Sequence, residues 1–252
     1  MLIDTHCHLD DPVLFDRLQE VIGNARQAGV NSLVVPGVGP QGWSRISALA
    51  DGESSIFSAF GLHPMLADHY HVTVLAELAR YAENAVAIGE IGLDYMLPEI
   101  PRDLQMLAFR DQLRLAVERG LPVMIHCRKA FSDLLLIMGE EHAERVGGIM
   151  HAFSGSAEVA GDCIRLGFAI SVAGPVTYKN AVRPVELVRK IAMEHLVLET
   201  DAPDMTPEPF RGNTNEPAFL LETAKKVAEI KGIPLEEVAA VTTRNAKRVL
   251  HL

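Results

Sequence analysis

LIDTHCH (residues 2–8) and LVLETD (residues 196–201) are the two stretches that point most directly to the fold. Each is a short apolar run followed at once by polar side chains, a pattern typical of a buried strand with functional groups at its end. In an open sheet the first and last strands lie far apart, whereas in a closed barrel they are neighbours. Asp201 can therefore join the histidines of the first stretch most directly if the sheet closes.

Short β-rich runs recur along the whole sequence, and most are apolar throughout, which indicates parallel strands buried on both faces. Segments with helical periodicity separate them, and two more follow the last run, at Pro217–Lys231 and Pro234–Leu250. No Gly-x-Gly-x-x-Gly motif follows the first run, which disfavours an open dinucleotide-binding sheet. We therefore predict an α/β fold, a (β/α)8 TIM barrel, as one domain over residues 1–252. The predicted strands are Leu2–Thr5, Ser32–Pro36, Ile56–Phe60, Val86–Gly89, Pro122–His126, Gly148–Ala152, Phe168–Val172 and Leu196–Thr200.

The composition is that of an ordinary globular enzyme, with 48% hydrophobic and 22% charged residues. No apolar run approaches the ~18 residues that a membrane span needs. The chain does not begin with a basic segment followed by an apolar one, so we expect no secretory signal. Cys7, Cys127 and Cys163 form no Cys-x-x-Cys pair, which fits a reducing compartment. We expect a cytoplasmic protein with no membrane association.

The net charge is the main objection to a nucleic-acid substrate, because 23 Lys plus Arg against 33 Asp plus Glu give −10. Such a chain repels DNA at long range unless basic residues or metal ions reverse the field locally. No run of interleaved aromatic and basic residues indicates base stacking. Scattered basic residues in loops that follow strands offer a modest basic rim: Arg102, Lys129, Lys179, Arg183 and Arg211.

Six potential metal ligands fall at the C-terminal ends of predicted strands, the face on which barrel enzymes build their active sites. His6 and His8 are two residues apart in a strand, so their side chains share one face. Cys7 then points to the opposite face, towards the helices. The six are His6, His8, Glu90, His126, His151 and Asp201.

These four imidazoles and two carboxylates are enough to hold two divalent ions. The predicted assignment gives His6, His8 and Asp201 to one ion and His126 and His151 to the other, with Glu90 as the bridge. Such donors suit Zn, Mn, Fe or Ni, and Mg fits where water completes its shell. Two ions roughly 3.5–4 Å apart generate a hydroxide and clamp a scissile phosphate. Asp201, placed to accept the proton of the attacking water, and Glu90 are the predicted catalytic residues.

The opposing interpretation of these histidines is structural, since a single buried histidine is more often a satisfied core residue than a ligand. Six titratable groups at strand ends of the same polarity are a different case. Burying them without a metal would carry a large desolvation penalty. His69 and His71 repeat the His-x-His spacing away from any strand end, and we predict that they are surface residues.

Six motifs occur in order at these strand ends: IDTHCHLD (3–10), GLHP (61–64), GEIGLDY (89–95), IHCRKA (125–130), HAFSGS (151–156) and ETDAP (199–203). Together they resemble the TatD family of metal-dependent deoxyribonucleases, among the amidohydrolase-like barrels. The resemblance implies metal-dependent hydrolysis of phosphodiester bonds in DNA, and the family's metal set matches the six ligands above. It also implies that His63 and Arg128 lie near the substrate.

Three further residues have a functional and a structural interpretation. His63 ends the third strand and could bind phosphate or donate a proton to the leaving oxygen, or it could belong to a structural turn. Arg128 could contact phosphate with two hydrogen bonds, or pair with an acid at the surface. Glu199 could orient a ligand histidine from outside the metal shell, or hold a basic residue across the barrel. Loop residues that could shape the pocket rim are Asp94, Asp204, Arg211 and Asn215.

We predict a deoxyribonuclease acting on ends or single strands, because a pocket in a barrel mouth admits a chain terminus more readily than a duplex. Its partner is then DNA as substrate, with no obligate protein partner. A small-molecule amidohydrolase, lactonase or phosphoesterase with the same two ions is the alternative, since the fold supports many chemistries. A non-catalytic scaffold is disfavoured, because a decayed site should have lost at least one ligand.

Overall fold

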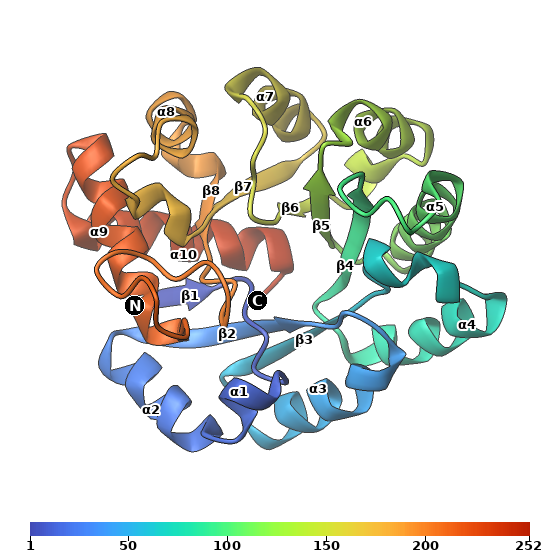
Figure 1. Cartoon of the computed structure of the whole chain (residues 1–252), viewed down its shortest axis with the longest axis horizontal. Helices are drawn as coiled ribbons and strands as arrows, with labels where there is room; N and C mark the ends of the chain where they lie inside the picture. The colour runs from blue at the N-terminus through green and yellow to red at the C-terminus, as the bar shows by residue number, and fades with distance from the viewer.

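The computed structural model describes residues 1–252, in which eight parallel strands form a ring surrounded by helices (Figure 1). The strands pair in chain order from β1 to β8. This is a (β/α)8 barrel and confirms the predicted fold. The strands are β1 Leu2–Asp4, β2 Val30–Pro36, β3 Ile56–Phe60, β4 Ala87–Asp94, β5 Val123–Arg128, β6 Gly148–Met150, β7 Phe168–Val172 and β8 Leu196–Leu198.

Helices alternate with the strands and cover the outside of the ring. They are α1 Pro12–Phe15, α2 Leu18–Gln27, α3 Pro40–Gly52, α4 Val72–Tyr81, α5 Arg102–Arg119, α6 Phe131–Glu140, α7 Ala157–Arg165, α8 Arg183–Lys190, α9 Leu220–Lys231 and α10 Leu235–Leu250. Short 3-10 turns are η1 Pro64–His69, η2 Ala82–Asn84, η3 Ala143–Arg145, η4 Gly174–Thr177, η5 Met193–His195 and η6 Pro217–Phe219. None of the helices combines the length and the apolar character that crossing a membrane requires.

The ring closes between β1 and β8 through backbone hydrogen bonds just beyond these short strands. The N–H of Thr5 donates to the carbonyl oxygen of Leu198 at 3.0 Å. The N–H of Asp201 donates to the carbonyl oxygen of His6 at 2.9 Å. The ends of the first and last strands are therefore neighbours, as the predicted site requires.

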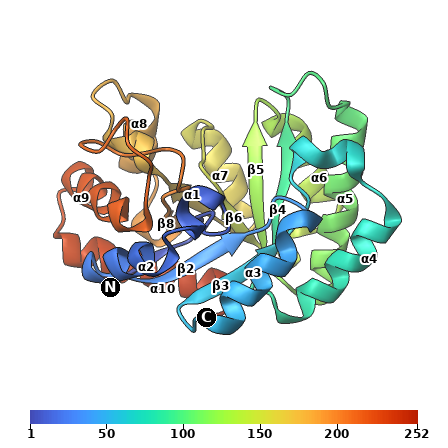
Figure 2. The ribbon, with the colours of Figure 1, turned by 60° about the horizontal axis from the view of Figure 1, so that its bottom comes forward.

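The N-terminal end of the barrel is filled with apolar side chains and closed by α10. Each strand contributes one residue to this layer, which packs against three residues of α10. In Figure 2 strands β4 and β5 point towards one side of the molecule while α10 lies at the other. The layer consists of Ile3, Val34, Ala59, Ala87, Met124, Ile149, Ala169 and Val197, with Ala246, Val249 and Leu250 from α10. This packing leaves the C-terminal end free for polar groups.

An ion-pair cluster joins α5 to the end of α6 on the outside of the barrel. Glu141 accepts hydrogen bonds from Arg110 at 2.8 Å and from the Nε and NH2 groups of Arg114, both at 2.7 Å. The hydrogen bonds from Arg114, followed by those from Arg110, outweigh burial and lower the pKa of Glu141.

Replacing Glu141 with Gln is expected to lower the free energy of unfolding by about 1 kcal/mol at neutral pH, since the arginines are partly exposed. The lowered pKa means that the ion pairs contribute fully above the ordinary carboxyl pKa and lose their contribution as the pH falls through the lowered value. Urea denaturation should show the difference between protein and variant shrinking in acid. Glu118→Gln removes a charge from α5 without breaking an ion pair; an equal loss there would contradict the prediction.

Candidate metal centre

The predicted metal ligands converge on one cavity of about 620 Å³ at the C-terminal end of the barrel. Five of them line it: His8, Glu90, His126, His151 and Asp201. The sixth, His6, is fully buried beneath them. Residues from distant parts of the chain thus share one site because parallel strands all end on the same face.

Glu90 lies at the centre of the cluster. Its Oε1 atom is 2.9 Å from Nδ1 of His126 and 3.7 Å from Nε2 of His151. The same oxygen is 3.7 Å from Nε2 of His63, and Oε2 is 3.3 Å from Nε2 of His6. Burial acts to raise the pKa of Glu90, but the surrounding imidazoles, His151 and His6 foremost, hold it well below the ordinary value. The carboxylate is therefore ionised. Its Oε1 atom faces His126 and His151, and its Oε2 atom faces His6.

Two glycines let the neighbouring strands approach Glu90. Gly92 has a φ of +143°, and a Cβ there would lie 2.0 Å from the carbonyl oxygen of His126. A Cβ on Gly61 would lie 2.7 Å from the carbonyl oxygen of Glu90. The GLHP and GEIGLDY motifs thus carry glycine where the backbones of β3, β4 and β5 come together around the site.

His6 and His8, just after β1, face Asp201, which follows β8. Their Nε2 atoms are 3.2 Å apart, on the shared face that strand alternation predicts. Oδ1 of Asp201 is 3.7 Å from Nε2 of His6 and 3.6 Å from Nε2 of His8. The same oxygen is 3.8 Å from Nε2 of His151. Cys7 between the histidines is buried in the core shared with the helices, whereas His69 is exposed, both as expected.

Asp94 has a different position from the pocket rim suggested by the sequence. It is buried, and its Oδ2 atom is 3.0 Å from Nε2 of His126. That contact turns Nδ1 of His126 towards Glu90. Burial acts to lower the pKa of His126, but Asp94 and Glu90 together raise it. A metal ion at Nδ1 would replace the proton there, while Asp94 would keep the ring oriented.

Glu199 makes the corresponding contact with His151. It is fully buried, and its Oε1 atom is 3.1 Å from Nδ1 of His151 and accepts the N–H of Ala152 at 2.6 Å. Burial acts to lower the pKa of His151, but Glu199, Glu90 and Asp201 raise it to about 10. The neighbour of Glu199 is therefore a histidine of the cluster, and no Lys or Arg pairs with it.

Buried polar atoms without a well-aligned hydrogen bond test whether these residues fit a metal. Four of the six such atoms in the protein belong to residues at or beneath the cavity: Nδ1 of His6, Oδ1 of Asp10, Nδ1 of His151 and Oε2 of Glu199. Three groups have donor atoms within 4.8 Å of one another: His6, His8 and Glu90; His6, His151 and Glu199; and His63, Glu90 and His126. Imidazole nitrogens and carboxylate oxygens are donors for divalent transition metals. The residues present fit a divalent metal site.

His63 is both part of a structural turn and open to the cavity. Its Nδ1 accepts the N–H of Met65 at 3.0 Å at the start of η1. Burial lowers its pKa to about 4, so the ring is neutral at pH 7. With Nδ1 occupied as an acceptor, the proton lies on Nε2, on the side of Glu90. His63 can therefore donate a hydrogen bond to a molecule in the cavity.

Of the other residues predicted to lie near the substrate or at the pocket rim, only some line the cavity. Arg128 is 59% exposed, 3.7 Å from Asp94, and does not line the cavity. Asn215 is not a rim residue, because it is fully buried and donates to the carbonyl oxygens of Thr200 and Asp204. Arg211 stacks on Tyr178 outside the cavity, whereas Asp204 lines it. Lining residues that the sequence analysis missed are Asp10, Gln41 and Arg45; Asp10 ends the first motif, and the others carry no signal of their own.

A (β/α)8 barrel with a histidine and carboxylate cluster at the mouth defines the class of barrel-fold metal-dependent hydrolases. The sequence model of the family described as TatD-related DNase matches residues 3–251, and the chain belongs to this family. The resemblance noted in the motifs is thereby confirmed.

The chain matches curated relatives and a solved structure along nearly their whole length. The chain is 44% identical over 255 residues to the uncharacterized metal-dependent hydrolase YabD of Bacillus subtilis, covering 100% of both chains. It is 34% identical to the uncharacterized metal-dependent hydrolase YcfH of Escherichia coli K12, covering 100% of this chain and 96% of that protein. The crystal structure of the TatD homologue YjjV from Escherichia coli K12 superposes with a TM-score of 0.93 at 32% identity, covering 100% and 98%.

Proposed function

We propose that the protein is a metal-dependent deoxyribonuclease that hydrolyses phosphodiester bonds at DNA ends or in single strands with water activated by two divalent ions. The observation that best supports this proposal is the position of Glu90. One of its oxygens faces His126 and the other faces His6, on opposite sides of the cluster. A carboxylate in that position suits a bridge between two ions. Membership of the TatD-related DNase family supports DNA as the substrate.

The residues divide the chemistry between them. When bound, two divalent ions supply an activated water and compensate the charge of the phosphate. His6, His8 and Asp201 would hold one ion, His126 and His151 the other, and Glu90 both. Asp201 would accept the proton of the attacking water. His63 would donate a hydrogen bond from Nε2 to the phosphate or the leaving oxygen.

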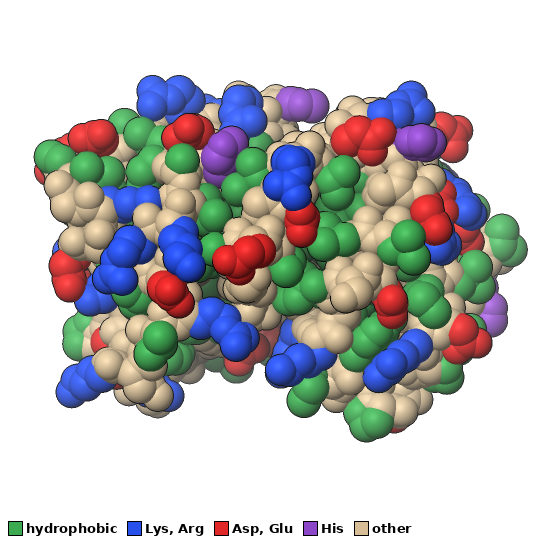
Figure 3. Space-filling view, turned by 90° about the horizontal axis from the view of Figure 1, so that it is seen from above, with side chains coloured by type: hydrophobic (Ala, Val, Ile, Leu, Met, Phe, Trp, Pro, Cys, Tyr) green, Lys and Arg blue, Asp and Glu red, His purple; other side chains and the backbone are tan.

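The charge of the cavity makes this proposal strongly dependent on metal. Its lining carries several carboxylates and a single Lys or Arg side chain, that of Arg45. Figure 3 shows the side of the barrel and not the cavity, and there too Lys and Arg side chains are interspersed with Asp and Glu and form no continuous basic field. Without ions the cavity therefore repels phosphate, and with ions the local field reverses.

The test uses end-labelled single-stranded DNA and metal-stripped protein, to which Mg, Mn or Zn is returned. Stepwise shortening should require an added ion, disappear with a chelator and be absent from Glu90→Ala. Added salt should weaken it, because phosphate binding releases counterions. Two ions bound per chain with no shortening by any metal would refute DNA as the substrate and favour a small ester or amide.

A further inference from the structure

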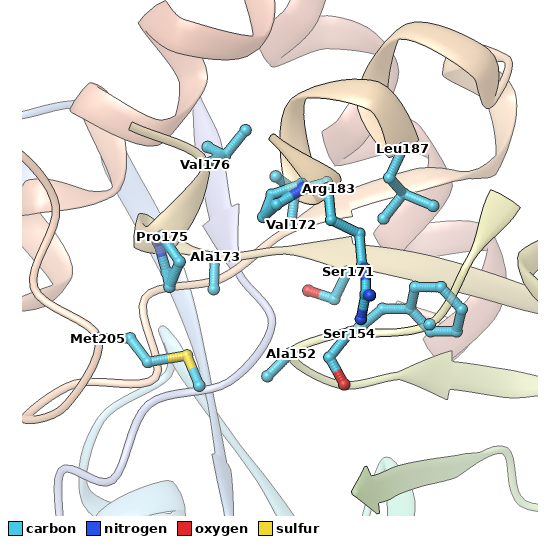
Figure 4. A pocket seen from close by; sticks show the side chains of 13 residues that line it. Ala152, Ser154, Ser171, Val172, Ala173, Pro175, Val176, Arg183, Leu187 and Met205 are labelled. Carbon is cyan, nitrogen blue, oxygen red and sulfur yellow. The ribbon is translucent and has the colours of Figure 1, made fainter. Parts of the chain in front are cut away.

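A second cavity lies beside the metal centre, between the loop after β6, the end of β7 and the start of α8 (Figure 4). Its volume is about 300 Å³, at the lower end of cavities that bind small molecules. Its walls are largely apolar: Phe153, Val172, Ala173, Pro175, Val176 and Leu187. A space of this size and lining suits one flat ring rather than a large ligand.

Two polar groups at this apolar cavity have no partner within the protein. Ser171 is 1% exposed, and its Oγ atom forms no hydrogen bond. Buried hydroxyls are normally paired, so a ligand with a polar edge would satisfy this one once the short side chain rotates its Oγ atom towards the cavity. Arg183, the first residue of α8, is exposed and lines the cavity without an ion pair. Figure 4 shows its side chain extending from α8 towards the loop that carries Ser154.

The apolar cavity shares two segments of chain with the metal centre. After β6, His151 lines the metal cavity and the next residue, Ala152, lines the apolar one. In the loop after β8, Asp204 lines the metal cavity and Met205 the apolar one. Successive Cα atoms are about 3.8 Å apart. The walls of the two cavities are therefore continuous along these two segments, and a substrate that spans both would have its phosphate at the metal centre and an attached group in the apolar cavity.

We propose that this cavity binds a base of the DNA substrate next to the scissile phosphate, and that Arg183 binds the adjoining phosphate. The inference rests on the proposed function. A nucleobase has flat apolar faces for Val172 and Leu187 and a polar edge for Ser171. An alkyl or acyl group would leave Ser171 unpaired, and a simple anion would leave the apolar walls empty. A nucleotide would fill the apolar walls with the faces of its base, pair with Ser171 through the edge of the base and bind Arg183 through its phosphate.

Thymidine 5′-monophosphate and deoxyribose 5-phosphate are matched probes, because both carry the phosphate and only the first carries a base. Each is titrated calorimetrically into the Mn-loaded protein. Thymidine monophosphate should bind about tenfold or more tightly, the effect of one well-packed base. Ala173→Leu fills the cavity and should abolish this preference, and Ser171→Ala should reduce it. Ala240→Leu adds the same group to a separate cavity beside the start of β1 and should leave the preference unchanged.

The outcomes separate this inference from the proposed function. Equal binding of the two probes, or an undiminished preference in Ala173→Leu, would overturn the base pocket. A protein that shortens DNA but binds both probes equally remains a deoxyribonuclease without this pocket. A protein that prefers thymidine monophosphate but shortens no DNA keeps the pocket, and its substrate is then a smaller nucleotide.

Discussion

Replacing Glu90 with Gln is expected to lower the rate of hydrolysis by at least about a thousandfold and to reduce the bound metal. The glutamine side chain would keep the shape of the glutamate but lose the negative charge that faces four imidazoles. His6, His63, His126 and His151 all lie within 3.7 Å of the carboxylate oxygens. Metal content per chain and initial rates, measured on the same preparation, test both parts of the prediction.

Glu216→Gln is the matched control for that substitution. Glu216 is also buried and accepts hydrogen bonds from Arg17 and Asn24, but it lies outside the metal cavity. The control should keep its metal and its rate, and thermal melting should show that both variants are folded. A Glu90→Gln protein that binds two ions and retains more than about a tenth of the rate would show that Glu90 is not the bridge.

Asp201→Asn is expected to reduce the rate by about a hundredfold to ten-thousandfold, the usual contribution of a positioned general base. The amide retains an oxygen near His6 and His8 but cannot accept the proton of the attacking water. Metal content should fall less than in Glu90→Gln, because Asp201 would hold one ion whereas Glu90 would hold both. Initial rates at saturating metal therefore distinguish a lost base from a lost ligand.

Asp204→Asn provides the comparison in the same cavity. Asp204 lines the cavity three residues after Asp201, and it forms no ion pair with the histidines. Its loss should change the rate much less. Equal losses in the two variants would mean that the carboxylates act through the general charge of the cavity. Unchanged hydrolysis in Asp201→Asn would remove it from the proposed chemistry.

Much of the site could be predicted because it depends on strand ends. His6 and His8 follow β1, and the two-residue alternation continues through them because Cys7 forms a parallel bridge to Ala202. The structure has their Nε2 atoms 3.2 Å apart. Barrel closure places Asp201 beside them, which the backbone hydrogen bond to His6 confirms. Their roles as metal ligands stay predictions until the ions are measured.

Contacts that depend on loop paths could not be predicted in the same way. Asn215 was expected near the rim, but the loop after β8 folds back and buries its side chain against two carbonyl groups. Arg211 stacks on Tyr178 of a different loop. Neither partner is marked by periodicity or spacing, because irregular segments have no repeating geometry that relates sequence separation to distance.

The barrel and the set of chemical groups gathered at the ends of its strands could be inferred from the amino-acid sequence alone. These features follow from apolar runs and strand alternation, which are local properties of the chain. Three others emerged only from the folded chain: Asp94 orients His126, Nε2 of His63 faces Glu90, and an apolar cavity around Ser171 adjoins the site. They depend on side-chain directions and on packing between distant segments, which no local pattern specifies.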